Sequence, residues 1–380
     1  MEKDIFNIFD SEQDFWNIKR DPGYEKSTIS VVDGSETHIG ELLFFGNESA
    51  QAGDILVVDK NGKKMYTDPV SYRTLKEDGE IGDNGYTPIG VCAIPAGLTV
   101  NLGNQGVNKG KSRVVSLANM SLKTPDTGTL RRGYVEGDNN MYWGDNTKVL
   151  GNTDNGSVFS KNPYTGVEKN MDWVRLPTTS YLLGPSHFSN IDKTDDHYPI
   201  HYMNRYYPGD GEDRFGVSPY GEFSNKFFQG YLGNLKGEEN CDLIMSKVTA
   251  PWQEGEIENS YAAGHCPTVC ACRRYHTKGT QAGDWYLPTI GELGIMWARM
   301  KEINDSLDLI GEGYAIKVGT LKEHREAGNN LNNFGGWLWS SLELNSIHSK
   351  YLFCSYGHAY WHSKSSLGSG GSRVRAFLAF

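Results

Sequence analysis

Side chains that can stack or form hydrogen bonds are concentrated near the end of the chain, between Leu342 and Gly371. This segment mixes Tyr, Trp, His and Phe with Ser and Gly and contains hardly any acidic residues. Aromatic side chains supply large contact areas at low entropic cost, and Ser and Gly supply adaptable hydrogen bonding. The composition therefore favours a ligand-binding surface. The alternative is that Tyr351, Phe353 and Trp361 are core aromatics among loops.

A second group of reactive residues combines cysteine with histidine between His265 and His276. Cys266 and Cys270 are four positions apart and would share one face of a helix. A structural zinc site needs four ligands, usually two such pairs, and no second pair follows in the sequence. The six cysteines are also too scattered to form a disulfide framework. We therefore predict no bound metal and expect these cysteines to pack as small apolar side chains.

An acidic loop at 208–213 offers the carboxylates of Asp210, Glu212 and Asp213. Several carboxylates in a flexible loop can hold calcium, but the twelve-residue EF-hand pattern is missing. We expect this loop to be a solvated turn.

Motifs of common catalytic sites are missing from the sequence. It contains no G-x-S-x-G, no H-E-x-x-H, no phosphate-binding P-loop and no Rossmann fingerprint. We therefore predict that the chain is not an enzyme, has no catalytic residues and needs no cofactor.

The overall composition narrows the class of protein further. A length of 380 residues allows two or three domains, and 38% hydrophobic with 22% charged residues indicates a folded chain. The net charge of −10 argues against nucleic-acid binding, since no basic stripe is available to contact phosphates. Neither a secretory signal nor an apolar run of about 18 residues is present, so we expect no membrane insertion.

The first third of the chain shows a β pattern. We interpret residues 1–35 as an N-terminal docking segment, and residues 36–110 as a small β domain. In this domain, Gly53–Asp59 and 64–67 are strands joined by an Asn61-Gly62 hairpin turn. A further apolar strand over Thr87–Pro95 ends at proline.

The last third shows helical and strand patterns that would support the aromatic segment. One helix is predicted over 258–276, and a clearer one runs from Thr289 to about Leu307. Thr289 and Glu292 form the T-x-x-E pattern of a capping box. Apolar residues follow at three- and four-residue spacing on one stripe, which we expect to pack under the sheet carrying the C-terminal segment. Trp337–Trp339 and Val374–Phe380 have the apolar character of strands.

Three runs of residues, in this order, resemble the variable proteins of diversity-generating retroelements. They are Trp285–Leu293 (WYLPTIGEL), Trp339–Glu343 (WSSLE) and Gly371–Phe377 (GSRVRAF). The resemblance covers about residues 180–380 and implies a C-type lectin-like fold of the formylglycine-generating-enzyme type. The expected fold is therefore α+β, with a C-terminal lectin-like domain over 181–380 preceded by the small β-rich domain. Residues 111–180 would be a linker or the opening loops of the lectin-like domain.

In this family the variable positions lie between the second and third runs, which places the variable region at about 339–380. Mutagenesis at adenines of asparagine codons yields Tyr, His, Ser, Gly, Cys, Leu, Ile, Phe or Asp, but not Trp. Trp361 is therefore either fixed or derived from another codon. The resemblance implies a ligand-binding surface formed by Leu342, Leu344, Ile347, His348, Lys350, Cys354, Tyr356, His358, Tyr360, Trp361, His362 and Leu367.

The function implied is that of a phage receptor-binding or virion surface protein. It would display a diversified patch to a bacterial surface protein or glycan, contact other virion subunits through its N-terminal region, and form a homotrimer. The hairpin and the Thr87–Pro95 strand are similar to N-terminal modules of Bacteroidetes phage tail-associated proteins. This resemblance implies that the small β domain at 36–110 attaches to a virion or to another subunit. One alternative is a fixed-specificity adhesin on a bacterial cell surface. Another is a relative of the formylglycine-generating enzymes.

Overall fold

The structure is a computed structural model that describes residues 25–27, 42–101, 108, 110–120, 141–152, 235–249, 263–316, 337–354, 358–365 and 372–380. Most of the expected docking segment and the acidic loop at 208–213 lie outside these ranges.

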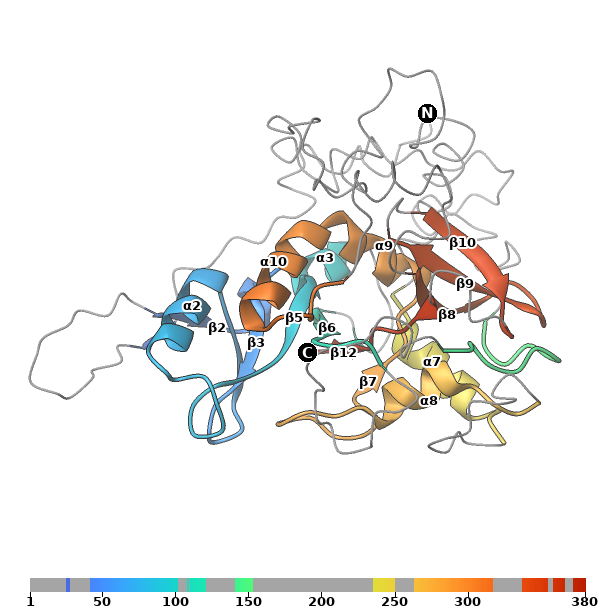
Figure 1. The fold of residues 1–380 in the computed structure, drawn as a ribbon, viewed down its shortest axis with the longest axis horizontal. Coiled ribbons are helices and arrows are strands. Elements are labelled where there is room, and N and C mark those ends of the chain that lie inside the picture. Colours follow the sequence, from blue (N-terminus) through green and yellow to red (C-terminus); the bar gives the residue numbers. More distant parts are fainter. Residues whose placement is uncertain are drawn as a thin grey trace, which may run out of the picture.

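Eight strands form one antiparallel sheet in the order β1-β2-β4-β3-β5-β6-β12-β7 (Figure 1). They are β1 (Glu25–Ser27), β2 (Leu42–Phe45), β3 (Ile55–Val58), β4 (Lys64–Thr67), β5 (Thr87–Ile94), β6 (Arg113–Ser116), β7 (Trp285–Tyr286) and β12 (Phe377–Ala379). Residues 25–27 of the expected docking segment thus pair with β2 as an outer strand.

The predicted hairpin is confirmed in β3 and β4. Gly62 has a φ of 85°, which glycine adopts without the clash that a Cβ atom would cause. The Asp59 carboxylate also accepts hydrogen bonds from the backbone N–H groups of Asn61 and Lys63, both at 2.8 Å. The strand predicted over Thr87–Pro95 is present as β5.

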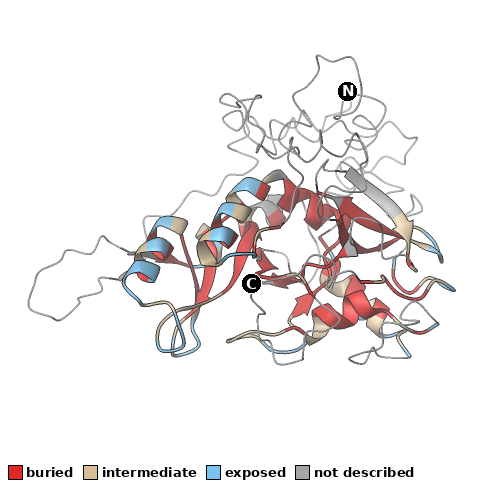
Figure 2. Cartoon of the chain, viewed as in Figure 1, coloured by how far each residue is buried: buried red, intermediate tan, exposed pale blue. Residues whose placement is uncertain are grey.

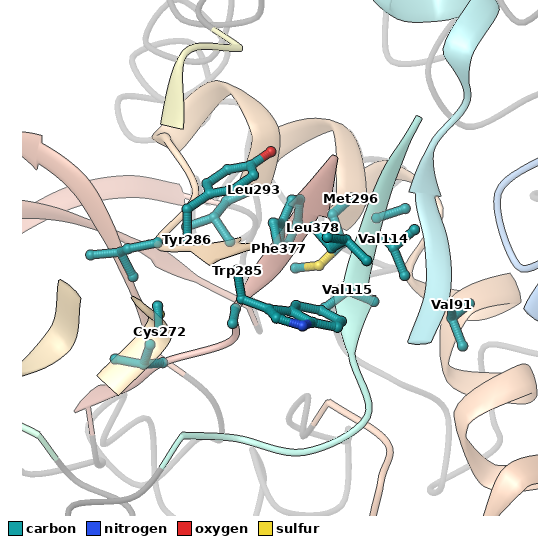
Figure 3. Close-up of a cluster of buried hydrophobic side chains, with 14 of the residues drawn as sticks. Val91, Val114, Val115, Cys272, Trp285, Tyr286, Leu293, Met296, Phe377 and Leu378 are labelled. Atoms are coloured by element: carbon teal, nitrogen blue, oxygen red, sulfur yellow. The ribbon is translucent and has the colours of Figure 1, made fainter. Parts of the chain in front are cut away.

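This sheet continues past the expected end of the small β domain. β12, at the end of the chain, lies between β6 and β7 and pairs with both. Figure 3 shows Val91 and Val114 packed in one buried cluster with Trp285 and Phe377, so both parts of the chain supply this core. Residues 113–116 are therefore an interior strand rather than part of a linker.

The second sheet contains four strands in the order β10-β9-β8-β11. They are β8 (Trp337–Glu343), β9 (His348–Phe353), β10 (His358–Ser363) and β11 (Ser372–Arg373). β8, β9 and β10 are antiparallel neighbours, whereas β11 runs parallel to β8.

The described helices are α2 (Pro69–Glu77), α3 (Ala96–Asn101), α7 (Gly237–Met245), α8 (Pro267–Arg274), α9 (Ile290–Ala298) and α10 (Met300–Ile310), with a 3-10 turn at Asn47–Ser49. α8 occupies the second half of the helix predicted over 258–276. The helix predicted from Thr289 to Leu307 is instead two helices, because the backbone leaves helical geometry at Arg299. The capping box is confirmed: Glu292 N donates to Thr289 Oγ1, and Thr289 N donates to a Glu292 carboxylate oxygen.

α9 contacts β5 of the large sheet and both β8 and β9 of the small sheet. Residues 290–297 are all buried (Figure 2), so α9 is covered on all sides and not only along the predicted apolar stripe. The predicted packing of this helix against the C-terminal strands is thus confirmed. The fold combines helices with two sheets and is compatible with an α+β class.

Candidate functional site

β8 and β9 form a hairpin, and the turn at its end contains both polar and apolar residues. We call this turn, residues 344–348, the hairpin tip. Asn345 Oδ1 closes this turn by accepting hydrogen bonds from Ile347 N at 2.9 Å and His348 N at 2.8 Å. His348 Nδ1 lies 3.2 Å from the same oxygen, and Leu344 N donates to His348 O at 2.9 Å. An Asx-type turn of this kind holds its shape through local hydrogen bonds and leaves the outward side chains available.

The hairpin tip brings several of the predicted ligand-binding residues to the surface. Ile347 is 49% exposed and is, with Val70, one of two large exposed hydrophobic residues in the described ranges. Leu344 and His348 are half-buried, and His362 is half-buried on the neighbouring strand β10. These four positions are the described part of the predicted surface that ligand can reach.

Three residues of the predicted surface are instead buried: Leu342, Lys350 and Cys354. Leu342 lies in β8, which is covered on both sides, and Lys350 lies in the middle of β9 between its two neighbouring strands. Cys354 follows β9, and its carbonyl accepts a hydrogen bond from Trp297 Nε1 of α9 at 2.7 Å. In this structure these three side chains cannot contact a ligand in solvent, which corrects the sequence prediction.

The remaining predicted residues are only partly described. His358, Tyr360 and Trp361 lie on β10 and pair in register with Phe353, Tyr351 and Lys350. Tyr356 and Leu367 lie outside the described residues.

The ring of His362 packs against two stacked aromatic rings. The rings of Trp337 and Tyr351 are 4.8 Å apart and nearly parallel, at 5°. His362 is tilted against both, with its ring centre 5.6 Å from Trp337 and 6.2 Å from Tyr351. Trp337 and Tyr351 are buried, so this stack positions His362 rather than offering a flat surface to a ligand.

A buried ion pair fixes the end of the small sheet. The Lys364 ammonium contacts the Glu343 carboxylate, and neither side chain is exposed. Lys364 Nζ also donates to Lys148 O at 3.0 Å and lies 4.8 Å from the centre of the Trp143 ring. Glu343 accepts further hydrogen bonds from the backbone N–H groups at 150 and 151, at 3.0 and 2.5 Å.

Residues 141–152 therefore pack directly on the C-terminal strands. Trp339 Nε1 donates to Met141 O and Trp143 Nε1 donates to Ser340 O, both at 2.8 Å. Sequence reasoning left open whether this stretch was a linker or opening loops, because its Asn, Gly and Asp content shows no strand pattern. Trp143 was the signal available for a buried role.

Two other charged groups join distant segments inside the fold. Arg113 of β6 forms an ion pair with Glu292 of α9 at 3.1 Å, and Tyr286 donates to the same carboxylate at 2.8 Å. Arg375 donates to Ser116 O at 2.8 Å and to Tyr314 O at 2.6 Å. Glu292 and Arg375 belong to the runs that resemble the retroelement variable proteins. Both side chains are buried and stabilise the framework.

Among the described residues, no three His, Cys, Asp or Glu side chains are close enough together to hold a metal ion. All six cysteines are buried free thiols. Burial raises the pKa of Cys354 and of Cys241 to about 12, so both are protonated at neutral pH. None of the described helices has the length and apolar character needed to cross a bilayer.

Compared with known proteins, the chain matches no family model, no curated protein and no solved structure. The resemblance to retroelement variable proteins therefore remains a prediction from the three sequence runs.

Proposed function

We propose that this chain is a surface-binding protein whose ligand contacts centre on the hairpin tip and the adjacent β10 strand. One observation carries the proposal: the ends of the C-terminal segment are buried, whereas the hairpin tip between them reaches solvent. Trp339 and Glu343, which precede the hairpin tip in the chain, are fully buried, and so are Ala376 and Phe377 near the end of the chain. Binding residues held by such a rigid scaffold can change without loss of the fold.

The biological role that best fits this arrangement is a phage receptor-binding or virion surface protein. A C-type lectin-like domain would display the diversified patch to a bacterial surface protein or glycan. The N-terminal region would join other virion subunits, and a homotrimer would multiply weak single contacts through avidity. A fixed-specificity adhesin is the second candidate, since the same scaffold would serve an unvarying tip equally well.

Catalysis of the formylglycine-generating type is disfavoured on chemical grounds. A reactive cysteine acts as a thiolate in an accessible position. Cys354 is the one cysteine of the C-terminal segment, and its thiol is buried with a pKa raised to about 12.

Binding of labelled protein to a panel of gut bacterial strains, measured by flow cytometry, tests the site. The double substitution Leu344→Ser and Ile347→Ser should lower binding about tenfold or more, as expected when a central apolar contact is lost. Val70→Ser is the matched control, since Val70 is exposed and apolar but lies on α2. Equal loss in both variants would contradict the proposed site.

The DNA next to the gene tests diversification. We expect a near-copy of the codons for residues 339–380, differing at adenines, beside a reverse-transcriptase gene. If the cell-binding test succeeds and no such copy exists, the fixed-specificity adhesin becomes the better description.

A further inference from the structure

Residues 141–152 place an exposed loop beside the hairpin tip. Figure 1 shows this segment, in green, next to the ends of β8, β9 and β10. Lys364 joins the two: its backbone N–H donates to Ile347 O of the tip at 2.8 Å, and its ammonium donates to Lys148 O at 3.0 Å. The tip and Lys148 are therefore separated by no more than the length of one lysine residue with a hydrogen bond at each end.

The loop at residues 146–149 is held in place at both of its ends. The carboxylate of Asp145 accepts hydrogen bonds from Thr147 N at 2.8 Å, from Thr147 Oγ1 at 2.6 Å and from Gly264 N at 2.8 Å. Directly after the loop, two backbone N–H groups donate to the buried Glu343 carboxylate. A loop that is ordered before binding loses little entropy when a ligand contacts its exposed side chains.

Lys148 makes its structural contact through the backbone. Its carbonyl accepts the hydrogen bond from Lys364, whereas the residue itself is exposed to solvent. The Lys148 side chain can therefore be replaced without removing this contact, and its ammonium is accessible to a ligand. The neighbouring Thr147 is exposed as well, but its hydroxyl donates to Asp145.

The exposed charge beside the hairpin tip is positive, although the chain as a whole carries a net charge of −10. In the described parts of 141–152 and 337–365, the acidic residues are Asp145 and Glu343, and both are fully buried. Each carboxylate already accepts several hydrogen bonds from within the fold. Lys148 therefore presents its charge next to an apolar tip and away from any exposed carboxylate of these two segments.

The groups exposed at the hairpin tip favour a protein ligand over a glycan. Ile347 is 49% exposed, whereas the rings of Trp337 and Tyr351, which could stack on a sugar, are buried. Asn345 Oδ1 closes the turn by accepting two backbone hydrogen bonds. Protein interfaces combine an apolar centre with a polar rim, and an exposed Ile347 beside an exposed Lys148 has this arrangement.

We infer that residues 146–149 form a second part of the binding surface, in which Lys148 pairs with a carboxylate of a protein ligand while the hairpin tip makes the apolar contact. The inference rests on the proposed function, since it describes the ligand of the same site. The loop lies outside the expected variable region at 339–380, so its charge would stay constant while residues of the tip vary. A fixed positive charge selects ligands with an acidic surface and speeds their association.

Titration of the labelled full chain onto a bacterial strain that it binds, followed by flow cytometry, tests the role of Lys148. Lys148→Gln should weaken the apparent affinity about three- to fivefold at low ionic strength, within the range of an exposed ion pair. Lys148→Arg keeps the charge and should bind as the unsubstituted protein does. Lys60→Gln is the matched control and should have no effect, since Lys60 is an exposed lysine in the turn between β3 and β4.

Salt distinguishes a lost charge from a lost shape. Raising NaCl from about 0.05 M to about 0.5 M should remove the difference between Lys148→Gln and the unsubstituted protein, because salt screens an exposed ion pair. Equal affinities at low salt would overturn the inference, even where Leu344→Ser with Ile347→Ser abolishes binding and so upholds the proposed function. If the unsubstituted protein binds no strain, the proposed function and this inference both fail.

Two further measurements check the ligand class and the fold. Binding should be lost from cells treated with protease beforehand, and retained binding would overturn the assignment to a protein carboxylate. Lys148→Gln should unfold in urea at the same midpoint as the unsubstituted protein, since the carbonyl at this position is kept. A lowered midpoint would show that the Lys148 side chain stabilises the fold instead, and would overturn the inference.

Discussion

The Lys364 ammonium and the Glu343 carboxylate form an ion pair whose side chains are both fully buried. The pair joins the end of β10 to the end of β8 and gathers residues 141–152 against them. The pair therefore fixes the strand ends next to the hairpin tip.

Replacing Glu343 by glutamine should lower the free energy of unfolding by about 3–5 kcal/mol, because a buried ammonium is left without its counter-ion. Urea denaturation measures the change. Asp305→Asn is the control, since the exposed Lys301–Asp305 pair should contribute about 1 kcal/mol or less. Similar losses in the two variants would show that the Glu343–Lys364 pair is accessible to solvent. Adding Lys364→Met to Glu343→Gln should recover part of the loss.

The hairpin tip and the adjoining strand should differ sharply in tolerance to substitution. Ile347→Ala should change the free energy of unfolding by no more than about 0.5 kcal/mol, because Ile347 is exposed. Leu342→Ala should cost about 2–5 kcal/mol, because it creates a cavity at a fully buried position. Chemical denaturation of both variants, matched to the unsubstituted protein, checks this contrast. A small effect at Leu342 would restore that residue to the binding surface.

The large sheet should unfold as one unit with the C-terminal strand. Phe377→Ala should cost about 3–5 kcal/mol, since Phe377 is buried between β6 and β7. Circular dichroism and tryptophan fluorescence should then show the same lowered midpoint. Val70→Ala, exposed on α2, serves as the neutral control. Two separate transitions, with the β1–β6 strands unaffected, would instead show an independent N-terminal domain.

The cysteines should be unreactive in the folded protein. With a pKa of about 12, the thiols of Cys354 and Cys241 are each ionised in only about one molecule in ten thousand at pH 8. Ellman's reagent should therefore label less than one thiol per chain under native conditions. All six should react in guanidinium, which is the internal control. Rapid native labelling at Cys354 would reopen the formylglycine-generating alternative.

The local elements follow directly from short sequence patterns. The Asn61-Gly62 turn and the Thr289–Glu292 capping box depend on residues within a few positions of one another, and both are present. The break at Arg299 was not predicted, since the apolar stripe continues through it and both helices bury the stripe.

The sequence by itself determined the Asn61-Gly62 hairpin, the capped helix and the apolar strands at both ends of the C-terminal segment. It also determined that the composition of this segment is that of a ligand-binding surface. Only the tertiary structure decided which residues of that segment reach solvent. Leu342, Lys350 and Cys354 have types that suit a binding surface, but α9 and residues 141–152 pack on the strands that carry them. Burial depends on contacts between segments far apart in the chain, and alternation along one strand contains no information about what covers each of its faces.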